Sequence, residues 1–253
     1  MKRQLSLLLT MTVLFGLLGM ANADLSLIGT ANYQGNDYNL IYEDDSIYGG
    51  LVWLDHTNEM AWHGEDDYWQ LQVDWASGLN TAGELTYDFN PGVSISWGGD
   101  WRLPTVDESK ANIGGGFGWE GPDETGYHDY EYGHNMVNSE MGHLHYLSLG
   151  NLGLYGTDGT NPQPGWGLTN VSYFANLYPY VYWTGLEWPH NPTDRAWDFH
   201  FYNGGQNGFA KSNNIYALAV RPAEVSTVPI PGAVFLLGSS LAGLVGIRRK
   251  FKH

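Results

Sequence analysis

The sequence predicts a single α+β domain, with two or three helices packed on twisted antiparallel strands, and three patterns support this fold class. Apolar residues recur at helical spacing between residues 67 and 78. A helix-capping motif follows Pro104. From residue 182 onward the spacing changes to two, the period of strands. The roughly 205 residues between the two ends of the chain suffice for one domain.

The N-terminal end has the order of a secretory signal peptide. Lys2 and Arg3 precede an apolar run from Leu5 to Met20, and residues 21–23 have the A-x-A form of a cleavage site. Residues 1–23 are therefore expected to be removed, and the domain is expected to begin at residue 24. A buried N-terminal helix is the alternative interpretation.

The first predicted helix runs from about Asp67 to Gly78. Its apolar side chains are spaced three or four residues apart from Trp69 to Leu79, and Asp66 and Asp67 precede them as candidate caps. An amphipathic helix of this length is expected to pack one face on the strands.

A second helix is predicted to begin at Thr105 and to end near Ile113. Thr105 and Glu108 have the T-x-x-E spacing of a capping box, and Pro104 favours extended backbone before it. Residues 114–138 contain mostly Gly, Tyr, Asp and Glu without apolar periodicity, which predicts a long surface loop.

Ser139 and Glu140 open a third predicted helix, which continues through Leu149. His143 and His145 lie within it. On a helix, side chains two residues apart point about 200° away from each other, so these two histidines would share a metal ion only on a strand.

The C-terminal part of the domain is predicted to be a system of antiparallel hairpins. Aromatic and polar residues alternate over 197–202, and apolar residues alternate again over 216–220. Glycine-containing turns are predicted at 203–205 and at 207–208. Residues 223–227 are predicted to be a linker to the C-terminal tail.

Charge and cysteine content exclude several functions. The chain has 11 basic and 27 acidic residues; six of the basic ones lie at the two ends, which leaves five against 27, a net charge of −22, between them. Such a surface repels nucleic acid. The chain has no cysteine, which excludes disulfides and thiol catalysis and requires a packed core for stability.

The C-terminal tail is similar to a bacterial sorting signal. Residues 232–247 carry no charge and form a short candidate membrane helix. They lie between the motif residues Val228, Pro229 and Pro231 and the basic residues Arg248, Arg249, Lys250 and Lys252. This arrangement resembles the PEP-CTERM signal of Gram-negative bacteria that make exopolysaccharide, although Ile230 replaces the usual Glu.

The PEP-CTERM resemblance implies a processing route. An exosortase-type enzyme would remove the tail after a transient stage in the inner membrane, and the protein would reach the cell surface or the extracellular matrix. The basic cluster would stay in the cytoplasm, which places residues 24–228 on the other side. An ordinary C-terminal membrane anchor is the alternative.

Several motifs over residues 49–222 resemble, in order, the Lcl C-terminal domain family, named after a collagen-like bacterial surface adhesin. They are GLVWLD at 50–55, Trp69, Trp75, GDWRLPT at 99–105, YWTG at 182–185, AW at 196–197, Gly204, Lys211 and AVR at 219–221. Residues 109–111 depart from the family, which usually has Leu after the Glu.

The RLPT turn also looks like that of formylglycine-generating and sulfatase-modifying proteins, and this resemblance implies a C-type-lectin-like domain. The catalytic cysteines of those enzymes have no counterpart here.

The motif residues are expected to have structural roles. They are Trp53, Asp100, Trp101, Arg102, Pro104, Thr105, Glu108, Trp183, Trp197 and Arg221. The four tryptophans are expected in the core. Arg102 is expected to pair with Asp100, Asp107 or Glu108, and Arg221 to brace the core through a bidentate carboxylate contact.

Acidic clusters offer oxygen ligands of the kind that calcium prefers. The candidates are residues 44–45 and 65–67, and the loop residues Asp123, Glu124, Asp129 and Glu131. None has EF-hand spacing, and solvated acidic loops are the alternative interpretation. No other cofactor is expected.

Aromatic residues in irregular, polar sequence form the candidate ligand site. They are Trp119, Tyr127, Tyr130, Tyr132, Trp166 and Trp188. Aromatic rings stack on the C–H faces of sugars, while neighbouring carboxylates and amides bind hydroxyl groups. Coverage of the core is the alternative role.

The sequence therefore predicts an exported, surface-sorted, non-catalytic protein of the extracellular matrix or exopolysaccharide layer, with glycan binding as its activity. G-x-S-x-G, H-E-x-x-H and P-loop motifs are absent. A secreted hydrolase that uses two carboxylates is one alternative. A purely structural matrix protein is the other.

Overall fold

The computed structural model describes residues 24–44, 49–61, 67–106, 133–158, 160–189 and 191–227. The predicted signal peptide, the sorting tail, most of the predicted second helix and residues 114–132 of the loop after it lie outside these residues. The rest of that loop is not all at the surface, because His134 and Met136 are buried. Within the described residues, no helix is long and apolar enough to cross a membrane.

The described fold is α+β and mostly β, which confirms the predicted class in its coarse form. Its strands are β1 (Asp24–Tyr33), β2 (Asn36–Asp44), β3 (Leu51–Asn58), β4 (Leu85–Phe89), β5 (Val93–Trp97), β6 (Val181–Glu187), β7 (Arg195–His200), β8 (Gly205–Ala210) and β9 (Tyr216–Thr227). The helices are α1 (Tyr68–Gly78) and α2 (Glu140–His143), and α2 continues as the π-helical turn η1 (Leu144–Ser148).

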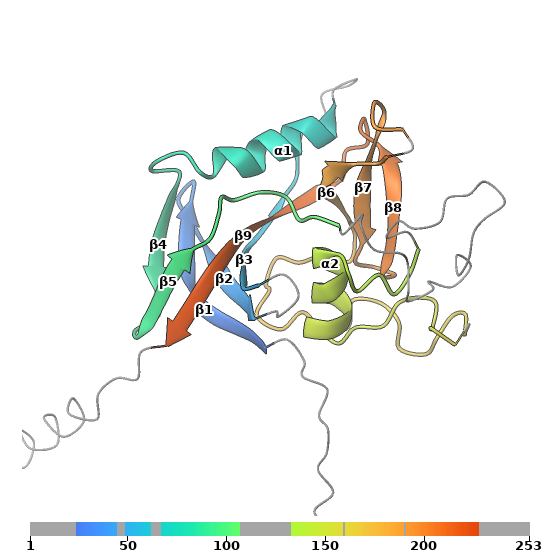
Figure 1. Ribbon diagram of the computed structural model, residues 1–253, viewed down its shortest axis with the longest axis horizontal. Helices are drawn as coiled ribbons and strands as arrows, with labels where there is room; N and C mark the ends of the chain where they lie inside the picture. Colours follow the sequence, from blue (N-terminus) through green and yellow to red (C-terminus); the bar gives the residue numbers. More distant parts are fainter. Residues whose placement is uncertain are drawn as a thin grey trace, which may run out of the picture.

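The strands form one sheet in the order β4-β1-β2-β3-β9-β6-β7-β8, and β5 pairs with the far half of β9. All strand pairs are antiparallel except β6 with β9. Figure 1 shows β9 crossing the middle of the molecule between β3 and β6. The predicted linker at 223–227 is therefore wrong, because these residues are the part of β9 that pairs with β5.

Both faces of the central strands are buried, under different helices. On β9, Ala217 and Ala219 belong to the apolar cluster that contains Trp69 of α1, whereas Leu218 and Val220 belong to the cluster that contains Met141 of α2. α1 and α2 accordingly lie on different sides of the sheet (Figure 1). The small side chains of Ala217 and Ala219 leave room in this cluster for large aromatic residues such as Trp69.

The predicted first helix is confirmed, with Asp67 as its cap. The Asp67 carboxylate accepts a hydrogen bond from the backbone N–H of Gln70 at 3.0 Å. Trp69 is buried and its ring nitrogen donates to the Thr184 carbonyl at 2.8 Å, which joins the helix to β6.

The predicted third helix begins as expected, because the Ser139 hydroxyl accepts from the Gly142 N–H at 3.2 Å. It remains α-helical only through His143 and then widens into the π turn. Gly142 has no room for a side chain, since a Cβ there would lie 1.9 Å from the Met136 carbonyl oxygen.

The four motif tryptophans are in the core, as predicted. Trp53, Trp101, Trp183 and Trp197 are each at most 1% exposed. The nitrogen of Trp53 donates to Glu43 at 2.7 Å, and that of Trp101 donates to the Tyr87 hydroxyl at 2.9 Å. Glu43 is itself fully buried.

Arg102 pairs with a residue that the sequence did not indicate, and two of its expected partners, Asp107 and Glu108, lie outside the described residues. Arg102 binds Glu140 of α2 through two 2.7 Å hydrogen bonds, and Glu140 also accepts from the Thr105 N–H at 2.8 Å. Asp100 is exposed, whereas Glu140 is 2% exposed. The fold brings Glu140 to this loop across a separation of 38 residues, which local spacing does not reveal.

Arg221 contacts a carbonyl and a ring among the described residues, instead of the expected carboxylate. Its Nε donates to the Gly99 carbonyl at 2.6 Å, and its guanidinium lies 4.3 Å from the centre of the Trp97 ring. These contacts hold the 99–102 loop against β9.

The hairpin prediction holds for the strands and fails for one turn. β7 and β8 pair from Arg195–Ala210 to His200–Gly205, with Gly204 in a left-handed conformation (φ 76°) at the turn. Residues 207–208 lie within β8. On β7, the polar residues Asp198 and His200 are buried as well as the aromatic ones, because both faces of this strand are covered.

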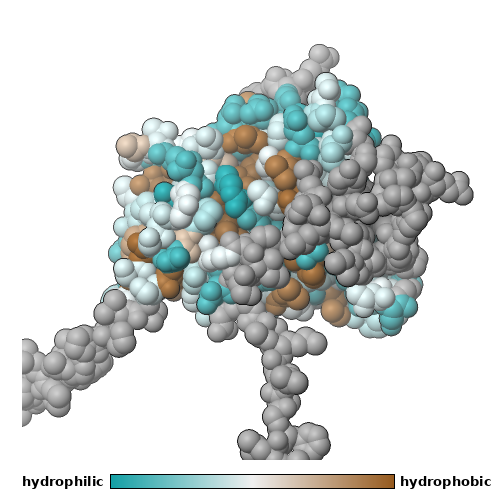
Figure 2. All heavy atoms as spheres, viewed as in Figure 1, coloured by the Kyte–Doolittle hydropathy of each residue, from teal (hydrophilic) through white to brown (hydrophobic). Residues whose placement is uncertain are grey.

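Hydrophobic residues on the face in Figure 2 appear as small separate areas among hydrophilic ones in the part drawn in colour. Among the described residues, the most exposed aromatic ones, at 45–48%, are Tyr173, Tyr178 and Tyr180.

We expect Glu140→Gln to lower the free energy of unfolding by about 3 kcal/mol, because it leaves the Arg102 guanidinium without its buried anionic partner. Denaturant unfolding of the full-length protein measures this change. Gln70→Ala, on the exposed face of α1, is the control and should change stability by less than about 0.5 kcal/mol. Equal stability of the two variants would contradict a structural role for the pair.

Candidate functional site

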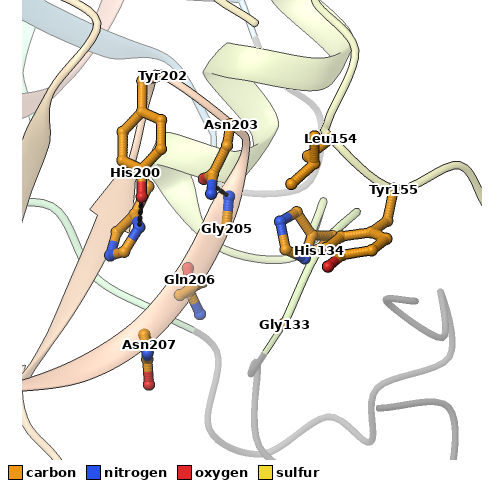
Figure 3. Close-up of a pocket in the computed structure, with 10 residues that line it drawn as sticks. All are labelled: Gly133, His134, Leu154, Tyr155, His200, Tyr202, Asn203, Gly205, Gln206 and Asn207. Atoms are coloured by element: carbon orange, nitrogen blue, oxygen red, sulfur yellow. Dashed lines mark hydrogen bonds between the residues drawn. The ribbon is translucent and has the colours of Figure 1, made fainter. Parts of the chain in front are cut away.

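A pocket of about 290 Å³ opens beside the turn between β7 and β8 (Figure 3). One wall contains His200, Tyr202, Asn203, Gly205, Gln206 and Asn207, and the opposite wall contains Gly133, His134, Leu154 and Tyr155. None of these residues is Asp, Glu, Lys or Arg. The described lining of the pocket therefore consists of aromatic rings, amide groups, a leucine side chain and backbone, and includes no permanently charged side chain.

Backbone hydrogen bonds hold the two walls together. Gly133 and Gln206 exchange both of their backbone hydrogen bonds, at 2.9 and 2.7 Å. The Leu154 N–H donates to the Asn203 carbonyl at 2.7 Å. The pocket is thus attached to the edge strand of the sheet on both sides.

Tyr146 of η1 holds the β7–β8 turn in place through hydrogen bonds. Its hydroxyl donates to the Gly204 carbonyl at 2.6 Å and accepts from the Asn135 N–H at 3.0 Å. A Cβ on residue 204 would lie 2.2 Å from this hydroxyl oxygen, and the backbone there has positive φ, so both effects require glycine.

A hydrogen-bonded chain runs from the sheet to the pocket. The Asp198 carboxylate lies 2.6 Å from Nε2 of His200, and Nδ1 of His200 lies 3.3 Å from the Tyr202 hydroxyl. The His200 and Tyr202 rings are stacked, with centres 5.4 Å apart. Tyr202 is therefore held in place although 40% of it is exposed.

Burial raises the pKa of Asp198, while its hydrogen bond to His200 and the charge of His200 act in the opposite direction. Asp198 is fully buried and His200 is 8% exposed. The contact to Asp198 thus occupies one ring nitrogen of His200 and orients the other toward Tyr202.

His134 differs from His200 because no described residue forms a hydrogen bond with its ring. It is 8% exposed, and neither of its ring nitrogens has a hydrogen-bond partner in the structure as described. Its ring meets the Tyr155 ring edge-on, with centres 4.6 Å apart. Burial, and secondarily the charge of His200, lower the pKa of His134 to about 4, so the imidazole is neutral at pH 7.

Glu43, His143 and Ser148 form a second cluster, on the α2 side of the sheet, that superficially resembles a catalytic triad. Oε1 of Glu43 lies 3.1 Å from Nδ1 of His143 and accepts from the Ser148 hydroxyl, which is 3.3 Å from the same nitrogen. A triad needs the acid and the nucleophile on different ring nitrogens. This cluster therefore orders the core and is not arranged for nucleophilic catalysis.

A separate group of tyrosines lies where β6 and β9 begin. The Tyr216 ring is 4.8 Å from that of Tyr180 and 6.2 Å from that of Tyr178, measured between centres. Tyr178 and Tyr180 are 48% and 47% exposed. Tyr182 supports them from within, because its hydroxyl accepts from the Tyr178 N–H at 2.9 Å.

The two sequence-predicted ligand residues that the structure describes, Trp166 and Trp188, are not among the residues that line the pocket. Trp166 is 40% exposed and lies beside Leu152. Trp188 packs edge-on against Trp197 and under the guanidinium of Arg195, which favours the alternative role of covering the core. The remaining four, Trp119, Tyr127, Tyr130 and Tyr132, lie outside the described residues.

The predicted metal ligands Asp123, Glu124, Asp129 and Glu131 also lie outside the described residues, as do the sorting residues and Glu108. Within the described ranges, no group of three or more His, Asp or Glu side chains is placed to hold a metal ion. His143 and His145 have separate surroundings, because His143 meets Glu43 whereas His145 packs against Phe199 and Phe201.

Sequence reasoning missed His134, Tyr155, His200 and Tyr202 as pocket residues. The signal for two of them was present, since Asp198, His200 and Tyr202 alternate on one strand face and its turn. His134 and Tyr155 carry no comparable pattern, and only the pairing of Gly133 with β8 brings them to this site.

Comparison of the chain with family models, with curated proteins and with solved structures finds no match.

We expect part of the pH dependence of stability to come from His134. The pKa of His134 is about 4 in the folded protein and its ordinary value is 6.5, so between these values the unfolded chain binds more protons. The free energy of unfolding should therefore fall as pH falls through this window, by up to about 1.4 kcal/mol per pH unit. Denaturant unfolding between pH 7 and pH 4 measures the slope.

His134→Gln should remove this contribution and flatten the slope relative to the unmodified protein. His145→Gln should have an effect of similar size, because burial also lowers the pKa of His145 to about 4. An unchanged slope in His134→Gln would show that this imidazole is not held neutral by the fold.

Proposed function

We propose that this protein is exported to the bacterial cell surface, sorted to the extracellular matrix or exopolysaccharide layer, and binds a neutral glycan there without catalysis. The binding site in this proposal is the pocket beside the β7–β8 turn. The observation that carries the proposal is the combination of two tyrosine rings, a tyrosine hydroxyl and three amide side chains in one concave site, whose described lining has no Asp, Glu, Lys or Arg.

The chemistry of the pocket favours a sugar ring. Tyr202 presents an exposed ring that is held by His200, and Tyr155 lies in the opposite wall. Asn203, Gln206 and Asn207 supply amide groups at the rim. Stacked rings with amide donors and acceptors bind polyhydroxylated ligands, whose apolar faces and hydroxyl groups need both kinds of contact.

Electrostatics favour a neutral ligand over an acidic one. The chain between the two end segments has a net charge of −22, while the described pocket lining has no basic side chain to offset it. A sulfated or uronic polymer would be repelled over the whole approach.

A glycan hydrolase of the usual kind needs two carboxyl groups across the scissile bond. The ten residues that line the described pocket include none, and the nearby Asp198 is fully buried against His200. These observations support glycan binding without catalysis better than glycan hydrolysis.

The C-type-lectin-like fold is part of the same proposal. The RLPT loop that carries this resemblance contacts α2 through Arg102 and Glu140, and pairs with β9 through the Arg102–Val220 bridge. The Lcl C-terminal resemblance and the two end signals support a surface role.

Tyr202→Ala should weaken binding to a neutral polysaccharide by about tenfold, because it removes the exposed stacking ring. The measurement is affinity electrophoresis of the full-length protein against a glucan, a galactan and a mannan. Tyr173→Ala is the matched control, since Tyr173 is 45% exposed and lies outside the pocket. Equal binding by both variants would exclude this pocket, and release of reducing ends would contradict the non-catalytic claim.

For the sorting route, intact mass spectrometry of the protein from an exosortase-containing host should find a chain that begins at Asp24 and lacks the segment 232–253. Replacement of Pro229 and Pro231 by alanine should leave the tail attached. Recovery of the uncut chain from the cytosol would contradict export.

A further inference from the structure

We infer that a second pocket, on the opposite side of the molecule, binds another segment of the same neutral polysaccharide, so that one molecule of the protein joins two glycan chains. This inference rests on the proposed function and adds to it a second binding site and a cross-linking role. The second pocket, named the β4 pocket, has a volume of about 200 Å³. Its lining includes residues 79–83, Tyr87 of β4, Asp100 and Arg221.

The two pockets lie at opposite ends of the sheet. β4 and β8 are the first and the last strand in its order, and each pocket lies beside one of them. Figure 1 shows β4 and β8 on opposite sides of the molecule. One sugar ring therefore cannot occupy both pockets, and two separate segments of polysaccharide are needed to fill them.

Hydrogen bonds of Asn80 hold two walls of the β4 pocket together. Its side chain accepts from the backbone N–H of Trp101 at 2.8 Å and donates to the Trp101 carbonyl at 2.9 Å. These contacts join the turn after α1 to the loop that carries Asp100. The fold thus sets the shape of the pocket before a ligand binds.

Arg221 is held in a way that leaves its terminal nitrogens available. Its Nε donates to the Gly99 carbonyl at 2.6 Å, and its guanidinium covers the Trp97 ring at 4.3 Å from the ring centre. Arg102 and Lys211 are ion-paired, but Arg221 forms no ion pair with a described residue. Because Arg221 is partly exposed and lines the pocket, a ligand there can accept hydrogen bonds from it.

Asp100 and Tyr87 add an acceptor and a donor to the same pocket. Asp100 is exposed and forms no ion pair with Arg221 or with another described residue. The Tyr87 hydroxyl accepts from the ring nitrogen of Trp101 at 2.9 Å, which leaves its own proton for another acceptor. The pocket therefore offers both signs of charge and a hydroxyl donor within one lining.

This set of groups matches a neutral ligand that is rich in hydroxyl groups. A hydroxyl both donates and accepts, so neighbouring hydroxyls on one sugar can bind Asp100 and Arg221 together. A carboxylate would be repelled by Asp100 and by the net charge of −22 between the two ends of the chain. A cation would be repelled by Arg221. The ligand class is thus the one proposed for the β7–β8 pocket.

The first test counts binding sites by isothermal titration of the full-length protein with tetrasaccharides from a glucan, a galactan and a mannan. We expect two sites for the tetrasaccharide that binds. Tyr202→Ala should weaken the site in the β7–β8 pocket. Ala82→Glu should weaken the site in the β4 pocket at least tenfold, because the added carboxylate lies in the pocket with Arg221 and competes for its guanidinium.

Thr86→Glu is the matched control, since it adds the same charge at an exposed position of β4 that does not line the pocket. This variant should keep both sites. Asp100→Asn preserves the shape of the pocket and should weaken the same site about fivefold, because an amide oxygen accepts a weaker hydrogen bond than a carboxylate does.

The second test measures light scattering of the protein mixed with the parent polysaccharide. Two sites on opposite sides of the molecule should join chains, so scattering should rise with protein concentration for the unmodified protein and for Thr86→Glu. Tyr202→Ala and Ala82→Glu each keep one intact site and should give no such rise.

The outcomes separate the inference from the proposed function. A single site that Ala82→Glu does not change would overturn the inference and leave the proposed function intact. Two sites without a rise in scattering would show that one chain fills both pockets, and the cross-linking role would be wrong. If Tyr202→Ala changes neither site, or if none of the three tetrasaccharides binds, the proposed function itself fails.

Discussion

The structure depends on one strand, β9, whose two faces are both buried. β9 pairs with β3, β5 and β6, and its alternate residues enter two different apolar clusters. Because α1 covers one cluster and α2 belongs to the other, every residue from Ala217 to Val220 must be apolar. This constraint places the two helices on opposite sides of the sheet and carries β6, β7 and β8 to the edge where the pocket forms.

Buried polar contacts attach the loops to this sheet. Glu140 binds Arg102 and the backbone of Thr105, and Asp55 accepts from the backbone N–H groups of Ala175 and Asn176 at 2.8 and 2.9 Å. Each carboxylate is at most 2% exposed, so each has its hydrogen bonds supplied by the protein. Such contacts select one loop arrangement more than they add stability.

The pocket differs from these loop contacts, because the buried imidazole of His134 in one of its walls has no hydrogen-bond partner among the described residues. His200 and Tyr202 are connected to Asp198, whereas His134 has rings and backbone around it and no hydrogen bond from the described chain. The described lining of the pocket is aromatic and amide-rich and has no Asp, Glu, Lys or Arg, and the protein is strongly acidic. These two features are the basis for the proposed neutral ligand.

Local patterns were sufficient for the helices at 68–78 and from residue 140, for the hairpin of β7 and β8, and for the buried tryptophans. These features depend on residues close in sequence, whose period and capping are visible without a structure. The partner of Arg102, the burial of Asp198 and the meeting of His134 with Gly205 join segments far apart along the chain. The sequence by itself therefore determined the coarse class of the fold and several of its elements, whereas the tertiary structure decided the strand order and the site, because only strand pairing brings the two walls of the pocket together.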